Sequence, residues 1–389
     1  MLQKRMVFEQ EAEYFSYMVQ MRRQLHQHPE VGFDLPETVK TVAAELEKMG
    51  IDYSTDYGQC SLVAQIGSGS KLIAMRADMD ALPVEEKTDL PYASKIKGRM
   101  HACGHDVHTA ILLTVAKYLK AREQDLGCRV RLIFQPAEES AVSGAKMMLD
   151  NGVMEGVERV LCTHCDNAVP AGTIGVCSGD YMAACVPLHI TFLGATAHAA
   201  MPEKGIDAIA MAHKAYGLMK EKVAQLAGDA RYIWSVGRFS GGTAHNVVAD
   251  RCDMDISFRF YDMEFAQQMK DATFAICEEI ARDFGGSVEI DWNMSTGPVC
   301  NDPETVEKVA GIATEQGLPL MQMQPRMSSE DFGWFLTKAK GMLFRFGTRN
   351  EELGCTTLAH CNDFRIDESG MLSAFKVFAT YALEYGKTE

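Results

Sequence analysis

Apolar and polar residues alternate along the N-terminal part of the chain with two different periods. Apolar positions spaced three or four residues apart predict amphipathic helices, and short continuous apolar runs predict strands. Four such segments are expected before residue 77: helices over 9–28 and 38–50, and strands over 61–66 and 71–76. A further helix is expected to end near Glu123, followed by a buried strand over 129–134. This alternation indicates an α/β sheet covered by helices.

The middle of the chain has a different order of elements. The patterns predict strands over 186–192, 232–239, 252–260 and 287–292, with helices over 206–226 and 263–284. This order, βαββαβ, is that of the ferredoxin-like unit, which can fold compactly inside a larger domain. We therefore expect an insert at 184–296, with residues 1–183 and 297–389 together forming the α/β domain.

Composition narrows the class of protein. A chain of 389 residues with 47% hydrophobic content suits two packed domains. A net charge of −15 without a Lys/Arg cluster argues against a nucleic-acid partner. The first fifteen residues have no signal-peptide core, and no apolar run could span a bilayer, so a cytoplasmic protein without a membrane partner is expected. The twelve scattered cysteines are then mostly free, buried thiols.

Potential metal ligands are concentrated in residues 100–108, with the sequence Met-His-Ala-Cys-Gly-His-Asp-Val-His. Cys103 and His105 are both good ligands. Gly104 between them lets the backbone of an expected non-helical segment adopt conformations that other residues disfavour, so that both side chains can turn towards one point. Asp106 lies where a helix would begin, so it either caps that helix or orients a ligand histidine. The alternative is a capped helix with incidental histidines.

Two adjacent carboxylates, Glu138 and Glu139, follow the predicted strand 129–134. The carboxyl ends of strands are where open α/β sheets usually build their sites. If one carboxylate binds a cation, the other can act as a general base towards a water molecule. The alternative is a solvated surface pair.

Three single histidines complete the set of candidate residues. His164 and His360 each end an apolar stretch of the expected α/β domain, whereas His198 lies in the insert. A lone histidine is usually structural, but this division between domains suggests different roles.

These stretches, in this order, resemble the M20 metallopeptidase and amidohydrolase family, in the branch of hippurate hydrolases, bacterial aminoacylases and plant auxin-conjugate hydrolases. The resemblance covers nearly the whole chain and is carried by Arg22-Arg-Gln-Leu-His-Gln-His-Pro-Glu-Val-Gly-Phe33, Arg76-Ala-Asp-Met-Asp-Ala-Leu-Pro83, His101-Ala-Cys-Gly-His-Asp106, Pro136-Ala-Glu-Glu139, Gly241-Gly-Thr-Ala-His-Asn246 and Ser329-Glu-Asp-Phe332. It implies a catalytic α/β domain with helices on both faces of a mixed sheet. It also implies that the ferredoxin-like insert is a lid through which the protein forms a homodimer.

The resemblance also implies a centre of two divalent metal ions, Zn²⁺ or Mn²⁺ first and Co²⁺ or Ni²⁺ as alternatives. The implied ligands are Cys103, His105, Glu139, His164 and His360, with Cys103 as the bridge. Glu138 then remains free to take a proton from the attacking water, and Asp78 is an acid close to the metals.

In the insert, the resemblance assigns substrate contacts. His198 corresponds to the lid histidine that supports the oxyanion, in several relatives from the neighbouring subunit. Asn246 and Arg259 correspond to the pair that holds the α-carboxylate of the substrate, an anion that suits an arginine fork.

The function so implied is a metal-dependent amidohydrolase that splits a small-molecule N-acyl amino acid into a carboxylic acid and a free amino acid. A dipeptidase or carboxypeptidase on the same scaffold is the nearest alternative. A non-catalytic metal-binding or thiol-sensing protein is another, because cysteines surround His164 and His360.

The chain departs from these relatives beside two of the implied ligands. Cys361-Asn-Asp replaces their usual Ser-Pro, and Cys165-Asp-Asn replaces an apolar or aromatic segment. Because both changes lie beside implied ligands, we expect them to alter the metal preference or the polarity of the pocket, and Cys162, Cys165 and Cys361 offer thiols to a soft cation.

Overall fold

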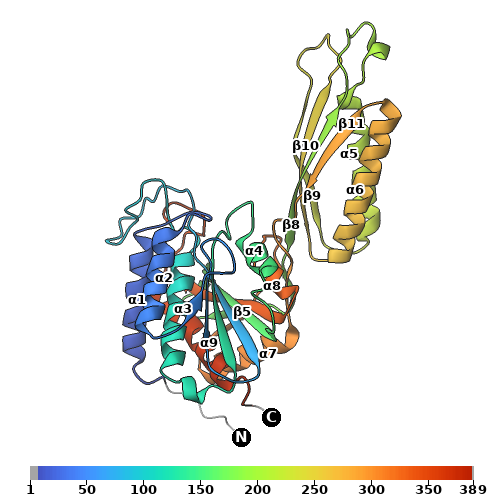
Figure 1. The fold of residues 1–389 in the computed structure, drawn as a ribbon. Helices are drawn as coiled ribbons and strands as arrows, with labels where there is room; N and C mark the ends of the chain where they lie inside the picture. The colour runs from blue at the N-terminus through green and yellow to red at the C-terminus, as the bar shows by residue number, and fades with distance from the viewer. Residues whose placement is uncertain (1–7, 388–389) are drawn as a thin grey trace. The chain divides into compact units, whose positions relative to one another are not determined.

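The computed structural model describes residues 8–387. Residues 1–7, the start of the stretch without a signal-peptide pattern, lie outside that description. The chain forms two compact units: unit 1 runs to Tyr181 and resumes over Val299–Pro325 and from Asp331, and unit 2 comprises Met182–Pro298 and Arg326–Glu330 (Figure 1). Among the described residues, no helix is both long and apolar enough to cross a membrane.

Unit 1 is built on an eight-stranded mixed sheet. Its strands are β1 (Tyr53–Ser54), β2 (Leu62–Ile66), β3 (Leu72–Asp78), β4 (Arg129–Gln135), β5 (Arg159–Pro170), β6 (Ile174–Val176), β13 (Leu320–Gln322) and β14 (Lys340–Arg349). They lie in the order β1-β2-β4-β3-β5-β14-β6-β13. The central strands β4, β3, β5 and β14 are parallel, so their carboxyl ends meet at one edge. A small second sheet pairs β7 (Gly179–Met182) with β12 (Val299–Asn301).

Helices cover both faces of this sheet, as predicted. They are α1 (Glu11–His26), α2 (Pro36–Lys48), α3 (His105–Lys120), α4 (Gly144–Asp150), α7 (Pro303–Glu315), α8 (Gly333–Leu336) and α9 (Met371–Glu384). Helix α3 packs against the sheet, α1 and α9. It is buried along most of its length, because its own apolar side chains project from all sides of the helix. The short helices α4 and α8 pack together on the opposite face (Figure 1).

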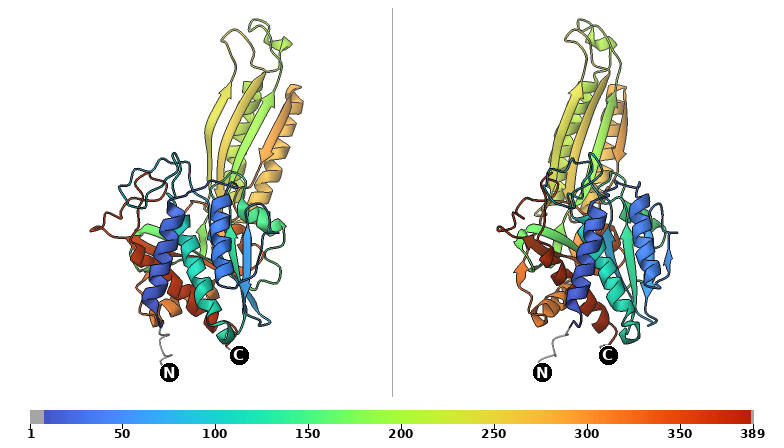
Figure 2. Two further views of the ribbon diagram at one scale, coloured as in Figure 1. Left: turned by 60° about the vertical axis from the view of Figure 1, so that its left-hand side comes forward. Right: turned by 90° about the vertical axis from the view of Figure 1, so that its left-hand side faces the viewer.

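Unit 2 has the predicted βαββαβ order. Its elements are β8 (Ala184–Leu193), α5 (Ala208–Ala227), β9 (Ile233–Gly241), β10 (Arg251–Phe260), α6 (Met263–Phe284) and β11 (Ser287–Trp292). The antiparallel sheet has the order β11-β8-β10-β9, and both helices lie side by side on one face (Figure 2). Buried and partly buried residues alternate along β10, because one face of the sheet packs on the helices and the other does not.

Unit 2 also takes in residues 326–330, which the predicted boundaries left in the α/β domain. Contacts from β10 and the residue after it help to hold this segment, beside a backbone hydrogen bond from Ala183 to the carbonyl of Ser328. Arg259 Nη1 donates to the carbonyl of Met327 at 2.9 Å, and the Tyr261 hydroxyl donates to the carbonyl of Arg326 at 2.9 Å.

Candidate metal centre

Cys103 and His105 stand at the start of helix α3. The helix begins at His105 itself, so the prediction of a non-helical segment is correct for Cys103 and wrong for His105. Gly104 precedes the helix with φ of 85°, a backbone conformation that favours glycine. A Cβ atom there would also lie 2.3 Å from Cys165 Sγ, so only glycine fits this turn.

Asp106 does not cap α3, and the two residues that its side chain contacts are not predicted ligands. It is the second residue of the helix, and its Oδ2 accepts from Arg22 Nε at 2.9 Å and lies 2.8 Å from His26 Nδ1. Burial favours the neutral acid, but Arg22 and His26 outweigh it and hold the pKa of Asp106 well below its usual range. Both expectations for Asp106 are therefore wrong: it fastens the start of α3 to α1.

The two glutamates follow the carboxyl end of β4, and a residue that the sequence reasoning did not select holds them. Asp80 accepts the backbone N–H of Glu138 at 2.9 Å and that of Glu139 at 3.1 Å. The turn into the pair passes through Ala137 with φ of 55°, a strained value for a residue with a side chain. The only sequence signal for Asp80 was its place two residues after Asp78.

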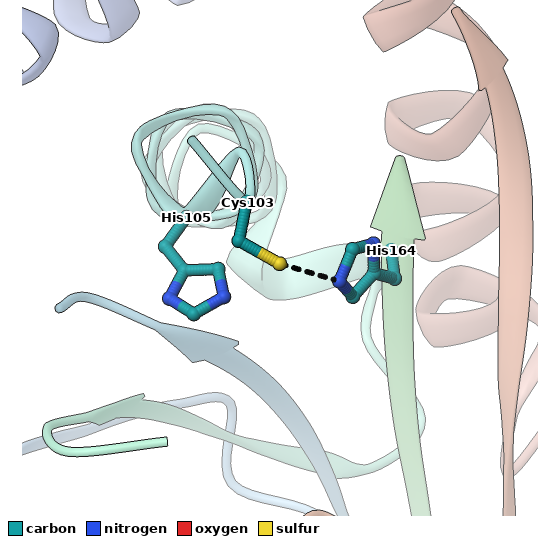
Figure 3. Close-up of side chains that lie close together, drawn as sticks. All are labelled: Cys103, His105 and His164. Carbon is teal, nitrogen blue, oxygen red and sulfur yellow. Dashed lines mark hydrogen bonds between the residues drawn. The ribbon is translucent and has the colours of Figure 1, made fainter. Parts of the chain in front are cut away.

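The predicted ligands of unit 1 lie together, and Figure 3 shows three of them, Cys103, His105 and His164. Cys103 Sγ lies 3.4 Å from His164 Nε2, and His360 Nε2 lies 3.0 Å from Glu139 Oε1. The ligand atoms of Cys103, His105 and His164 are within 4.8 Å of one another, and so are those of Cys103, Glu139 and His360. Cys103 belongs to both groups, as a bridging ligand would.

His105 shows that these residues fit a cation. Neither of its buried ring nitrogens has a hydrogen bond of normal geometry to any residue of 8–387. Instead, Nε2 lies 3.7 Å from carboxylate oxygens of Asp78 and Glu138 and 3.9 Å from one of Glu139. Three carboxylates around one imidazole nitrogen need a positive charge among them, which a divalent cation supplies.

The pKa values of these groups reflect the same surplus of negative charge. Burial disfavours the imidazolium, but the carboxylates led by Asp78 outweigh it and raise the pKa of His105 to about 10. Burial and the charges of Glu139 and Glu138 raise the pKa of the Cys103 thiol well above its usual value. A bound cation opposes both effects, because it attracts the thiolate and the neutral imidazole as ligands.

The loop that carries His360 is tied to the centre by its backbone and by Asn167. The His360 N–H donates to the carbonyl of Ala102 at 2.8 Å, next to Cys103. The Asn167 amide donates to the carbonyls of Thr357 at 2.7 Å and Arg365 at 2.8 Å, on either side of His360. Asn167, one of the residues at which this chain departs from its relatives, therefore holds the loop of the predicted ligand His360.

The thiols near the centre have distinct surroundings. Cys162 Sγ is buried and accepts from Arg76 Nη1 at 3.4 Å, and Cys165 Sγ is buried 3.5 Å from the carbonyl of Cys103. Burial raises the pKa of the Cys165 thiol. The thiols of Cys162 and Cys165 are thus buried near the predicted ligands, whereas the thiol of Cys361 is exposed.

The remaining predicted residues, His198, Asn246 and Arg259, belong to unit 2. His198 and Asn246 lie on neighbouring segments, where His198 bridges to Val247 and the Ala199 N–H donates to the carbonyl of Asn246 at 3.0 Å. Arg259 Nη1 also donates to Ser329 Oγ at 3.1 Å. The structure thus brings His198 and Asn246 together within this unit.

Residues 74–384, which include every candidate residue named above for both units, match peptidase family M20/M25/M40. The chain belongs to this family. The resemblance inferred from the motifs is confirmed.

Individual relatives of the M20 family align over most of both chains. The chain is 35% identical over 360 residues to the N-acetyl-L-cysteine deacetylase of Bacillus subtilis (strain 168), covering 92% of this chain and 85% of the relative. It is 35% identical over 379 residues to thermostable carboxypeptidase 1 of Saccharolobus solfataricus, covering 95% of each. The crystal structure of the YXEP protein of Bacillus subtilis, described as a dinuclear metal-binding peptidase from the M20 family, is similar with a TM-score of 0.81 and 32% identity, covering 97% of this chain and 100% of that one.

Proposed function

We propose that this chain is a metal-dependent amidohydrolase that cleaves the amide bond of N-acyl amino acids, releasing a carboxylic acid and a free amino acid. The observation that carries the proposal is the cluster of Cys103, His105, Glu139 and His164 beside a further carboxylate, Glu138, which the ligand set does not need. The similarity to an N-acetyl-L-cysteine deacetylase supports an N-acyl amino acid as the substrate.

The proposed metal ligands are Cys103 as the bridge, with His105, Glu139, His164 and His360. Two divalent ions, Zn²⁺ or Mn²⁺ in the first place, would supply a Lewis acid for the amide carbonyl and lower the pKa of a water molecule. The similarity to a dinuclear metal-binding peptidase supports the number of ions.

Glu138 is the proposed general base. Its carboxylate takes a proton from the attacking water and gives it to the leaving amine. Asp80 fixes the backbone of Glu138 and of its neighbour Glu139, so the base and a ligand keep one geometry. Asp78 is the proposed acid close to the metals, with a carboxylate oxygen 3.7 Å from His105 Nε2.

Unit 2 is proposed to act as a lid that binds the amino-acid part of the substrate. Arg259 and Asn246 would hold its carboxylate, and His198 would support the oxyanion that forms on the amide. A carboxylate anchor of this kind makes the free acid a better substrate than its amide.

A substrate panel tests this proposal. Purified protein is given N-acetyl amino acids, dipeptides with a free amine, and N-acetyl amino-acid amides, with Glu138→Gln as the inactive control. We expect hydrolysis of the N-acetyl amino acids, and little turnover of the other two groups. Preferred cleavage of dipeptides, or equal rates for wild type and Glu138→Gln, contradicts the proposal.

The same panel addresses the two other candidate functions. A carboxypeptidase or dipeptidase, suggested by the likeness to thermostable carboxypeptidase 1, prefers a peptide on the acyl side. A metal-binding or thiol-sensing protein turns over no member of the panel. The pair of Glu138 and Glu139 disfavours this last candidate, because a metal store needs no further base.

Unit 2 is also the proposed homodimer interface, supported by the edge strand β9 and its neighbour α5. They expose the apolar side chains Ile209, Leu218, Ile233 and Phe239. An unpaired strand edge with exposed apolar residues suits a second copy of the chain. Light scattering should give a dimer, and a monomer would contradict this part of the proposal.

Subunit exchange tests whether His198 serves the partner's site. Inactive His198→Ala protein is mixed with inactive Glu138→Gln protein under conditions in which exchange is verified. If His198 acts on the partner, one site of the mixed dimer is intact and activity reappears. No recovery after verified exchange means that His198 serves its own chain.

The proposed compartment is the cytoplasm. All twelve cysteines, each within residues 8–387, are free thiols in the structure, as expected in a reducing compartment.

A further inference from the structure

His108 lies between the residues of the metal centre but is not one of the proposed ligands. It follows His105 by three positions on α3, so both side chains project from one side of the helix. Its ring centroid is 5.6 Å from that of His105 and 4.6 Å from that of His164. The side chain is buried.

Both ring nitrogens of His108 are occupied by hydrogen bonds. The backbone N–H of Cys165 donates to Nε2 at 3.0 Å, and Nδ1 lies 2.7 Å from Asp78 Oδ1. Because Nε2 accepts, the proton of the neutral ring is on Nδ1 and is donated to Asp78. His108 therefore has no lone pair left for a cation and is not itself a ligand.

The hydrogen bond from Cys165 to His108 takes the place of a bond between neighbouring strands. Strands β3 and β5 pair only as far as Arg76 and Cys162. Cys165 lies three residues further along β5, where β3 is no longer its pairing partner. A buried N–H at this point needs another acceptor, which the imidazole of His108 provides. Helix α3 thereby holds β5 beyond the point where its pairing with β3 ends, while β5 stays paired with β14 on its other side.

Cys165 in turn orients the proposed ligand His164. The Nδ1 atom of His164 lies 2.7 Å from the carbonyl of Cys165, so this nitrogen carries the proton and Nε2 keeps its lone pair. That Nε2 atom faces Cys103 Sγ at 3.4 Å. A backbone carbonyl that fixes a ligand histidine in this way is a common feature of metal sites.

Asp78 completes the arrangement on the other side of the ring. Its second oxygen accepts from Arg76 Nη1 at 2.7 Å, and Arg76 Nη2 donates to Asp331 at 2.9 Å. These bonds fix the carboxylate that receives the proton of His108. They therefore select the tautomer in which Nε2 of His108 is an acceptor.

We propose that His108 is a positioning residue of the metal centre: anchored by Asp78, it holds the Cys165 backbone and so aims His164 at the metals. This inference rests on the proposed function for its importance to catalysis. Its structural part concerns metal binding alone and is tested without any substrate.

Two substitutions separate the contacts of His108. In His108→Gln, the side-chain oxygen reaches about as far as Nε2 and can still accept from Cys165. In His108→Asn, the amide reaches only about as far as Nδ1, so it keeps the bond to Asp78 and leaves the Cys165 N–H without an acceptor. Thr114→Val is the control, because it removes a buried hydrogen bond of the same helix, to the carbonyl of Ala110, away from the ligands.

The first measurement is hydrogen exchange of the Cys165 amide in the metal-free proteins, together with their melting temperatures. We expect protection in wild type, His108→Gln and Thr114→Val, and faster exchange in His108→Asn. Equal protection in both His108 variants would overturn the proposal, because the imidazole would then not be what holds this amide.

The second measurement is the affinity for Zn²⁺ alone, by competition with a chelator. Loss of a group that orients a ligand typically weakens metal binding about 10- to 100-fold. We expect that loss in His108→Asn, and affinity within about threefold of wild type in His108→Gln and Thr114→Val. Wild-type affinity in His108→Asn, or an equal loss in both His108 variants, would overturn the proposal. If wild type binds zinc normally but hydrolyses no N-acyl amino acid, the proposed function fails while this result still stands.

Discussion

The carboxylate of Asp80 accepts the backbone N–H of Glu138 at 2.9 Å, across 58 positions of the sequence. Its other oxygen accepts the N–H of Glu139 at 3.1 Å, so one side chain holds the proposed base and a proposed ligand together. Both hydrogen bonds need an acceptor, and the Asp80 side chain offers one at each of its two oxygens. The geometry of the two glutamates therefore depends on a residue that neither binds a metal nor transfers a proton in the proposed mechanism.

Replacing Asp80 by Asn should weaken the centre, because the amide nitrogen cannot accept one of the two N–H groups. We expect a loss of about 10- to 100-fold in metal affinity or turnover. Asp302→Asn is the matched control, since Asp302 also accepts a backbone N–H, from Thr305 at 3.0 Å at the start of α7, where Asn caps as well as Asp. Equal kinetics in wild type and Asp80→Asn would show that the two bonds do not matter.

Glu138→Gln should keep the metals and lose turnover. The amide has nearly the same shape as the carboxylate but cannot take a proton from water, and loss of a general base typically costs about 10²–10⁴-fold. Metal content by mass spectrometry and kcat are measured on the same sample. A rate close to that of wild type would remove Glu138 from the mechanism.

Arg259→Ala should lower kcat/KM for substrates with a free carboxylate and change little for amidated analogues, which lack the anchored charge. Arg259 also holds residues 326–330, so a second variant is needed to separate the two roles. Tyr261→Phe removes the bond to the carbonyl of Arg326 and touches no proposed substrate group. If both variants reduce the two substrate classes equally, the role of Arg259 is structural.

Asp106→Asn should destabilise the metal-free protein in a pH-dependent way. Arg22 and His26 hold the pKa of Asp106 below its usual value despite burial, so the ionised form stabilises the folded state above pH of about 3.9, and this stability is lost as the pH falls. Removing one partner of a buried ion pair costs about 3–5 kcal/mol. Urea unfolding at pH 7 should show that difference from wild type, and at pH 3 a smaller one. A difference that is the same at both pH values would contradict the assignment.

The sequence predicted those features that a local pattern determines. The order βαββαβ of unit 2 follows from alternating periodicities along 184–296, and these elements all form. Gly104 was selected for its backbone, and its φ of 85° agrees. The cluster of Cys103, His105 and His164 was implied by the resemblance to a known family, and the structure brings these residues together.

The features that were missed depend on contacts between distant residues. Asp106 looked like a cap because of its place near a helix start, but its partner His26 is 80 positions away. Asp80, Asn167 and His108 carried no pattern that pointed to their contacts. Periodicity shows which face of an element is buried, and it does not show which polar side chains meet where several strands end.

A titration of metal-free protein most directly tests the central claim, that a two-metal centre around Cys103 hydrolyses N-acyl amino acids. Zn²⁺ or Mn²⁺ is added stepwise to wild type and to Cys103→Ala, while bound metal and hydrolysis of an N-acetyl amino acid are measured together. The account predicts no activity without metal, full wild-type activity at two ions per chain, and loss of bound metal in Cys103→Ala. Hydrolysis by the metal-free protein, or wild-type metal content and activity in Cys103→Ala, would contradict it.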